Sequence, residues 1–224
     1  GVTNLTIVGD AFGRPMVEAL AAAVAAGNPH DISSLRGILS SGVMWSQEIK
    51  DQLLEFHEMT LVDTLGSSEG VGFGASVARR DRRTRTAGFR LGPDAAVFTE
   101  TGATVEPGSG EVGILAVGGP IPIGYYKDPD KTAQTFREFD GRIWSVPGDH
   151  AVVEAAGAIT LMGRGSASIN TGGEKVFPEE VEEAVKTHPG VVDCLVVGVP
   201  DERWGSAVTA VVQPTDATLT ESEV

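Results

Sequence analysis

The sequence predicts an α/β fold: a parallel α/β layer, then a β-rich subdomain, then the start of a small α+β domain. Three observations support this. Strand and helix patterns alternate through residues 1–85, short apolar runs bounded by glycine fill 86–163, and a helix followed by two strands comes after Arg164. The boundary between the two domains is predicted at 163–166.

The first part contains three apolar strands separated by two helices. A strand over 5–8 precedes an alanine-rich helix, which Pro15 is predicted to open and which ends at Gly27. A second strand over 35–39 leads to a helix opened by Ser46, and a third strand follows over 61–65. Helical crossovers between short apolar strands predict that these strands pair in parallel.

Glycine-bounded apolar runs in the next part predict further strands, over 95–98, 113–117 and 159–162. Beyond the boundary, Pro178 is predicted to open a helix that ends near Thr187. Two more strands are predicted over 191–199 and 207–212.

Composition limits the class of protein. The 224 residues carry a net charge of −14, which argues against nucleic acid as a partner, because that binding depends on neutralising phosphates. No apolar run reaches the roughly 18 residues of a transmembrane helix, and no charged-then-apolar leader opens the chain. The lone Cys194 lies in an apolar run and is predicted to be a buried strand thiol. We therefore expect a cytoplasmic protein, with the basic run Arg79–Arg85 as solvated surface.

The segment TLGSSEG over 64–70 follows the third strand and has several interpretations. As G-x-S-x-G it imitates the nucleophile elbow of α/β-hydrolases, with Ser68 as nucleophile. That interpretation needs an acid and a histidine downstream, and Asp149-His150 and His188 are the nominal candidates. As G-x-G-x-x-A, beginning at Gly70, it imitates a dinucleotide-binding fingerprint. A plain turn without function is also open.

Two glycine turns later in the chain carry a carboxylate and a guanidinium, in Gly148-Asp149 and Gly163-Arg164. Such a pair can hold the two hydroxyls of a ribose, which need acceptors and donors at fixed separation. In this setting the pair resembles the ribose-binding end of the adenylate-forming superfamily. Other segments resemble motifs of that family in the same order: LRGILSSGV from Leu35, GSSE from Gly66, GEVGILAVGGPIPIGYYKDPDKTAQTF from Gly110, VPGD from Val146, GRGSASINTGGEKVFPEEVE from Gly163 and VPDERWG from Val199.

The resemblance implies an acyl-CoA synthetase, most similar to bacterial ligases for fatty acids or steroid side chains. Such an enzyme uses ATP and Mg²⁺ to convert a carboxylic acid to acyl-AMP, then forms a thioester with coenzyme A. It would have no nucleic-acid partner and could be a homo-oligomer. The implied roles are catalytic for Ser68 at the phosphate and Glu69 at the metal, ribose binding for Asp149 and Arg164, and framing of adenine and acyl chain for Gly42, Val43, Leu65 and Gly66.

The resemblance also implies a domain assignment. Residues 1–163 would be the C-terminal portion of a large adenylation domain, with the α/β layer over 1–85 and the β-rich subdomain over 86–163. Residues 164–224 would be a hinge and an incomplete small C-terminal domain.

The sequence departs from the family pattern at Ser166, Asn170 and Pro147. It also lacks the loop ending in Pro-Lys-Gly and the late lysine of the family. We therefore expect the 224-residue chain to be incomplete for catalysis. A nucleotide-binding remnant without turnover, or a hydrolase using Ser68, are the alternatives.

Overall fold

The structure, a computed structural model, describes residues 1–217 and 219–220. Its elements in chain order are β1 (Asn4–Ile7), α1 (Gly9–Ala25), β2 (Gly37–Ser41), α2 (Gln47–Phe56), β3 (Thr60–Ser67), β4 (Gly70–Ala78), β5 (Gly88–Leu91), β6 (Ala95–Phe98), β7 (Val112–Val117), α3 (Pro129–Thr135), β8 (Phe136–Phe139), β9 (Arg142–Ser145), β10 (Asp149–Val153), β11 (Ala158–Arg164), the 3₁₀ turn η1 (Gly165–Ala167), β12 (Ile169–Thr171), β13 (Glu174–Val176), α4 (Pro178–Lys186), β14 (Val191–Asp201) and β15 (Gly205–Pro214). The predicted α/β fold class is confirmed.

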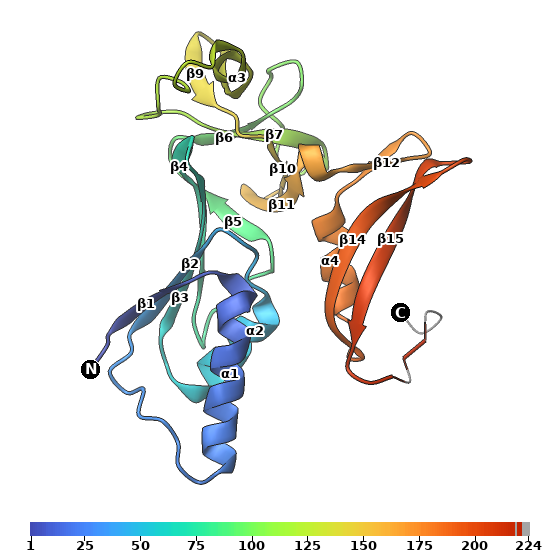
Figure 1. The fold of residues 1–224 in the computed structure, drawn as a ribbon. Coiled ribbons are helices and arrows are strands. Elements are labelled where there is room, and N and C mark those ends of the chain that lie inside the picture. The colour runs from blue at the N-terminus through green and yellow to red at the C-terminus, as the bar shows by residue number, and fades with distance from the viewer. Residues whose placement is uncertain (218, 221–224) are drawn as a thin grey trace. The chain divides into compact units, whose positions relative to one another are not determined.

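A mixed sheet of eleven strands runs in the order β1-β2-β3-β4-β5-β11-β10-β7-β9-β8, and β6 pairs with β7. β1, β2 and β3 pair in parallel, as predicted, and β4 returns antiparallel to β3. The two crossover helices, α1 and α2, lie on one face of these strands (Figure 1). The chain divides into two compact units, the first made of 1–147 with 151–161 and the second of 148–150 with 162–224.

Helix α1 begins at Gly9, so the prediction that Pro15 opens it was wrong. Contacts from other elements set its start. The Gly9 amide donates to Ser40 Oγ at 2.9 Å, and the Asp10 carboxylate accepts from the Ser46 amide at 2.9 Å. Pro15 lies inside the helix, where its missing N–H removes one helical hydrogen bond. The prediction that Ser46 opens α2 is confirmed, because its Oγ accepts from the amide of Ile49.

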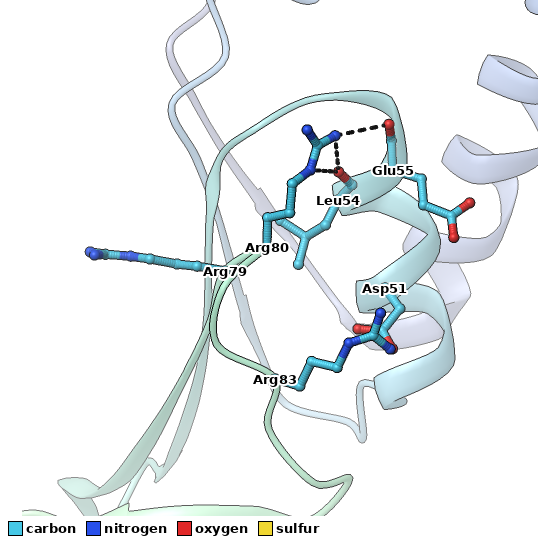
Figure 2. Close-up of a pocket in the computed structure, with 6 residues that line it drawn as sticks. All are labelled: Asp51, Leu54, Glu55, Arg79, Arg80 and Arg83. Atoms are coloured by element: carbon cyan, nitrogen blue, oxygen red, sulfur yellow. Dashed lines mark hydrogen bonds and ion pairs between the residues drawn. The ribbon is translucent and has the colours of Figure 1, made fainter.

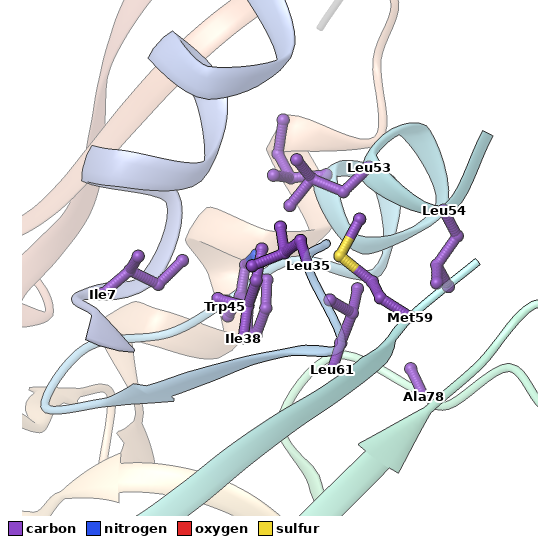
Figure 3. Packing of buried hydrophobic residues seen from close by; sticks show 10 residues of the cluster. Ile7, Leu35, Ile38, Trp45, Leu53, Leu54, Met59, Leu61 and Ala78 are labelled. Atoms are coloured by element: carbon purple, nitrogen blue, oxygen red, sulfur yellow. The ribbon is translucent and has the colours of Figure 1, made fainter. Parts of the chain in front are cut away.

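The core of the parallel layer lies between the sheet and the two helices. Figure 3 shows residues of this cluster, which include Ile38 and Leu61 from the strands and Leu53 from α2. Trp45 is fully buried, so it packs in the core. Gly13 allows α1 to approach α2 closely, since a Cβ there would lie 2.7 Å from Ile49 Cγ2.

One ion pair is buried in this layer. Lys50 of α2 places Nζ 3.1 Å from Oδ2 of Asp63 on β3, with side chains 2% and 6% exposed. The ammonium also lies 5.3 Å from the centroid of the Trp45 ring. Burial raises the pKa of Asp63 above its ordinary value, and the attraction of Lys50 offsets only part of that effect. The pair therefore joins α2 to β3 at a desolvation cost.

The β-rich part of the first unit has its own core. Phe73, Val97, Leu115 and Ile159 are almost completely buried within it. A smaller aromatic cluster joins β6, β8 and β9, where Phe98 contacts Phe139 and Trp144.

In the second unit, β14 and β15 form an antiparallel pair against which α4 packs. The predicted helix start at Pro178 is confirmed. Cys194 is 5% exposed on β14, so the predicted buried strand thiol is confirmed as well, and burial raises its pKa. Within the described part of the chain, no helix is both long enough and apolar enough to span a membrane.

Candidate functional site

The residues predicted to frame adenine and acyl chain lie near the ends of two neighbouring parallel strands. Gly42 and Val43 follow β2, and Leu65 and Gly66 lie near the C-terminal end of β3. The parallel pairing of β2 with β3 ends at Ser41 and Thr64, so the residues after this point on both strands reach the same edge of the sheet. Gly42 has φ +97°, a conformation that favours glycine, and the Val43 side chain is 53% exposed. Ligands of α/β sheets bind at this edge, beyond the carboxyl ends of parallel strands.

Ser68 and Glu69 form the two-residue turn of a β-hairpin. Ser67 at the end of β3 pairs with Gly70 at the start of β4. A nucleophile elbow requires a helix after the serine, and a dinucleotide fingerprint requires its glycines to open a helix. A strand follows instead, so neither pattern has its required context. Both of those interpretations of residues 64–70 were wrong.

Glu69 is held by a residue that the sequence analysis did not select. The Tyr125 hydroxyl donates to Glu69 Oε1 at 2.5 Å, and Lys131 Nζ lies 4.1 Å from the centroid of the tyrosine ring. This hydrogen bond holds the pKa of Glu69 below its ordinary value and raises the pKa of Tyr125. Glu69 is therefore an ionised, oriented carboxylate. Tyr125 lies in the GYYKDPDKT segment, which the sequence analysis had matched to a family motif, and that match is the signal that could have pointed to it.

A single oriented carboxylate has the chemistry to hold a magnesium ion that phosphate oxygens also bind. In residues 1–217, no group of three or more His, Cys, Asp or Glu side chains is arranged to hold a metal ion. Mg²⁺ is commonly held by one or two carboxylates together with substrate phosphates. The half-buried Glu69, oriented by Tyr125, matches that pattern.

The second unit brings Asp149 and Arg164 together, from the start of β10 and the end of β11. Arg164 Nε lies 3.5 Å from Asp149 Oδ1, with side chains 60% and 15% exposed. The turns are joined by a hydrogen bond from the Gly165 amide to the Gly148 carbonyl at 2.9 Å. The carboxylate and guanidinium thus lie side by side on linked glycine turns. Their role in binding ribose stays a prediction.

The segment around the predicted hinge is tightly packed at one glycine. Gly163 has φ +114°, and a Cβ there would overlap the carboxylate of Glu179 on α4. Ser166, in η1, and Asn170, on β12, are both exposed. Two of the three positions that depart from the family pattern, Ser166 and Asn170, therefore lie on the surface of this unit.

A cavity of about 240 Å³ lies elsewhere in the first unit, between α2 and the turn after β4 (Figure 2). Arg80 donates to the carbonyls of Leu54 and Glu55 at the end of α2, and Arg83 pairs with Asp51. The Arg80 guanidinium thus bonds the free carbonyl oxygens at the C-terminal end of α2, and the Arg83 guanidinium neutralises a carboxylate of the same helix. The cavity therefore has a structural explanation, and none of the predicted site residues lines it.

Known proteins with similar sequences and structures indicate what the chain resembles. Residues 180–224 match the family described as the AMP-binding enzyme C-terminal domain. The amide bond synthetase McbA from Marinactinospora thermotolerans has a similar structure, with a TM-score of 0.80 and 26% identity, over 99% of this chain and 44% of that one. The predicted resemblance to the adenylate-forming superfamily is confirmed.

Among the curated relatives are two acyl-CoA ligases. A 3-oxocholest-4-en-26-oate–CoA ligase of Rhodococcus rhodochrous is 48% identical over 94% of this chain and 39% of its own length. A medium/long-chain-fatty-acid–CoA/3-oxocholest-4-en-26-oate–CoA ligase of Mycolicibacterium smegmatis is 46% identical over 97% and 40%. The chain therefore spans about two fifths of the length of these relatives.

Proposed function

We propose that the protein carrying this sequence is an AMP-forming acyl-CoA synthetase. The carboxylate of its substrate attacks the α-phosphate of ATP and displaces pyrophosphate, which gives acyl-AMP. The thiol of coenzyme A then attacks the acyl carbonyl and releases AMP. The observation that carries the proposal is the Asp149–Arg164 pair on linked glycine turns, in a chain 46–48% identical to such ligases.

Asp149 and Arg164 are proposed to bind the ribose of the nucleotide. The carboxylate accepts hydrogen bonds from the two hydroxyls, and the guanidinium donates to their oxygens. Their spacing of 3.5 Å suits two adjacent hydroxyl groups. Neither side chain meets a reacting atom, so both act by positioning the nucleotide.

Glu69 and Ser68 are proposed to act at the phosphates. Ser68 is exposed at the tip of the hairpin, where its hydroxyl can donate to a phosphate oxygen. Glu69 would bind the Mg²⁺ that accompanies the nucleotide and supplies charge neutralisation at the phosphates. Because the turn is only two residues long, it holds both side chains at one end of the β3–β4 hairpin.

The proposed substrates are medium- or long-chain fatty acids, or the carboxylate of a steroid side chain. The names of the two ligases from Rhodococcus rhodochrous and Mycolicibacterium smegmatis support this class. Gly42, Val43, Leu65 and Gly66 are proposed to line the path of adenine and acyl chain. The half-exposed apolar side chain of Val43 suits an apolar ligand there.

The domain assignment is part of the same proposal. Residues 1–163 would form the late part of a large adenylation domain, and 164–224 a hinge with part of a small C-terminal domain. Rotation about residues 164–166 would exchange the adenylation arrangement for the thioester-forming one. A cytoplasmic location and a possible homo-oligomer complete the proposal.

Asp149→Ala tests the ribose assignment. Pyrophosphate release is measured with ATP, a medium- or long-chain fatty acid and a steroid carboxylate. Loss of hydrogen bonds to a charged group, about 1.5–3 kcal/mol, should raise the KM for ATP by roughly 10–100-fold. The fall in kcat should be smaller, because Asp149 contacts no reacting atom.

Asp81→Ala is the matched control, since Asp81 is an exposed aspartate in a turn outside the site. A fully active Asp149→Ala protein would show that the site assignment is wrong. ATP binding that depends on Asp149, without acid-dependent pyrophosphate release, would favour the nucleotide-binding remnant instead.

A further inference from the structure

The side chain that holds Glu69 comes from a distant part of the chain. Tyr125 lies 56 residues further on, in the segment between β7 and α3, and its hydroxyl donates to Glu69 Oε1. Glu69 is also fixed on the backbone side, because its amide donates to Ser67 Oγ at 3.2 Å. The carboxylate thus has one oxygen engaged by the protein and belongs to a residue whose backbone is tied within the turn.

Tyr125 is itself held by its surroundings. Its amide donates to Thr132 Oγ1 at 2.9 Å, and that hydroxyl donates to the Asp128 carbonyl at 2.6 Å. Gly124 has φ +148°, and a Cβ there would lie 2.6 Å from Thr132 Cγ2, so a glycine is needed beside this anchor. Lys131 places its ammonium 4.1 Å from the centroid of the tyrosine ring. These contacts hold the backbone and the ring of Tyr125, and they therefore fix the position of its hydroxyl group.

A carboxylate binds a cation more tightly when a hydrogen-bond donor already holds it in the orientation that binding requires. A hydrogen bond to one oxygen restricts rotation of the carboxyl group and leaves the other oxygen for the metal. An exposed glutamate without a partner would lose that rotational freedom only when the cation binds, which weakens affinity.

We infer that Tyr125 is a positioning residue, whose hydroxyl holds Glu69 Oε1 so that the carboxylate meets a divalent cation in one fixed orientation. The inference rests on the proposed function, in which Glu69 binds the Mg²⁺ of the nucleotide.

The neighbouring tyrosine provides a matched control. The side chain of Tyr126 is 87% exposed, and Lys127 lies over its ring at 5.2 Å, much as Lys131 lies over the ring of Tyr125. The two tyrosines thus share a sequence context and a cation–π contact. The hydrogen bond to Glu69 is made by Tyr125. Removing each hydroxyl in turn isolates the effect of that bond.

The test measures Mn²⁺ binding by electron paramagnetic resonance, in the presence of a non-hydrolysable ATP analogue. The proteins are wild type, Tyr125→Phe, Tyr126→Phe, Glu69→Gln and the double variant Glu69→Gln/Tyr125→Phe. Loss of a hydrogen bond that orients a metal ligand typically costs 10–100-fold in affinity. We expect about tenfold weaker Mn²⁺ binding for Tyr125→Phe, no change for Tyr126→Phe, and no further loss in the double variant.

The Mg²⁺ concentration for half-maximal activity should rise in parallel, with kcat largely restored at saturating Mg²⁺. Thr132→Val gives a second route, because it removes the anchor and keeps the tyrosine hydroxyl. We expect a loss smaller than that of Tyr125→Phe.

Unchanged Mn²⁺ affinity in Glu69→Gln would contradict the metal role of Glu69 in the proposed function. A loss in Glu69→Gln with none in Tyr125→Phe would overturn only the inference about Tyr125. An equal loss from Tyr125→Phe with and without Glu69 would also overturn it, because the tyrosine would then act by another route.

Discussion

Replacement of Lys50 by methionine should strongly destabilise the first unit. The substitution keeps most of the side-chain volume and leaves the carboxylate of Asp63 buried without its cation. At the observed separation of 3.1 Å, the attraction of two unit charges is about 5 kcal/mol for an effective dielectric constant of about 20. Removing one partner of a buried pair typically costs about 3–5 kcal/mol.

The expected loss for Lys50→Met is about 3 kcal/mol at pH 7, at the lower end of that range. Protonation of Asp63 would remove its charge and reduce the cost of burying it without a cation, and burial already raises the pKa of this group. Urea unfolding of the 224-residue chain, followed by circular dichroism, measures the loss. It should become smaller at acid pH, where a protonated Asp63 needs no cation.

Two controls make the test specific. Lys186→Met removes one partner of an exposed pair, since Lys186 Nζ lies 3.3 Å from Asp193 Oδ1 with side chains 31% and 66% exposed, and should cost less than about 1 kcal/mol. The double variant Lys50→Met/Asp63→Leu should regain most of the stability, because apolar residues can replace a buried ion pair. A loss below 1 kcal/mol for Lys50→Met, or a double variant less stable than the single one, would refute this reasoning.

Three further results are expected. Gly163→Ala should cost about 2 kcal/mol in urea unfolding, because it combines a φ of +114° with overlap between the new Cβ and Glu179. Gly173→Ala is the control and should cost about 1 kcal/mol, because Gly173 has a φ of +91° but lies in open space. Equal losses in the two variants would contradict the effect of the overlap. Ser46→Ala should cost about 1 kcal/mol through loss of the α2 cap, and Ser46→Asp should retain the stability because aspartate also caps helices. Unchanged stability of Ser46→Ala would contradict a role for the cap. A carboxyl NMR titration should give Asp63 a pKa above 3.8. Relative to Asp63→Asn, wild-type stability should then be greatest below pH 3.8 and fall as pH rises through the folded pKa; the opposite trend would exclude a raised pKa.

Features that depend on local interactions could be predicted from the sequence. Ser46 opens α2 and Pro178 opens α4, because a capping hydroxyl and a fixed φ act within a single helical turn. The parallel pairing of the first three strands also followed, since helical crossovers leave little other choice. Asp149 and Arg164 were predicted as a pair because each follows a glycine turn and the family motifs place them together.

Features that depend on tertiary contacts could not be predicted from the sequence. The start of α1 depends on Ser40 and Ser46, which lie more than 30 residues from Gly9 and Asp10 and override the local signal of Pro15. The hairpin at 67–70 depends on β4, whose pairing with β3 turned an apparent elbow into a two-residue turn.

The partners of two carboxylates were likewise set by the folded chain. Glu69 receives its hydrogen bond from Tyr125, and Asp63 receives its cation from Lys50. Sequence alone supplies the types of side chain and the elements that carry them. Which carboxylate meets which donor depends on distances between elements, and these distances exist only once the sheet has formed and the helices have packed against it.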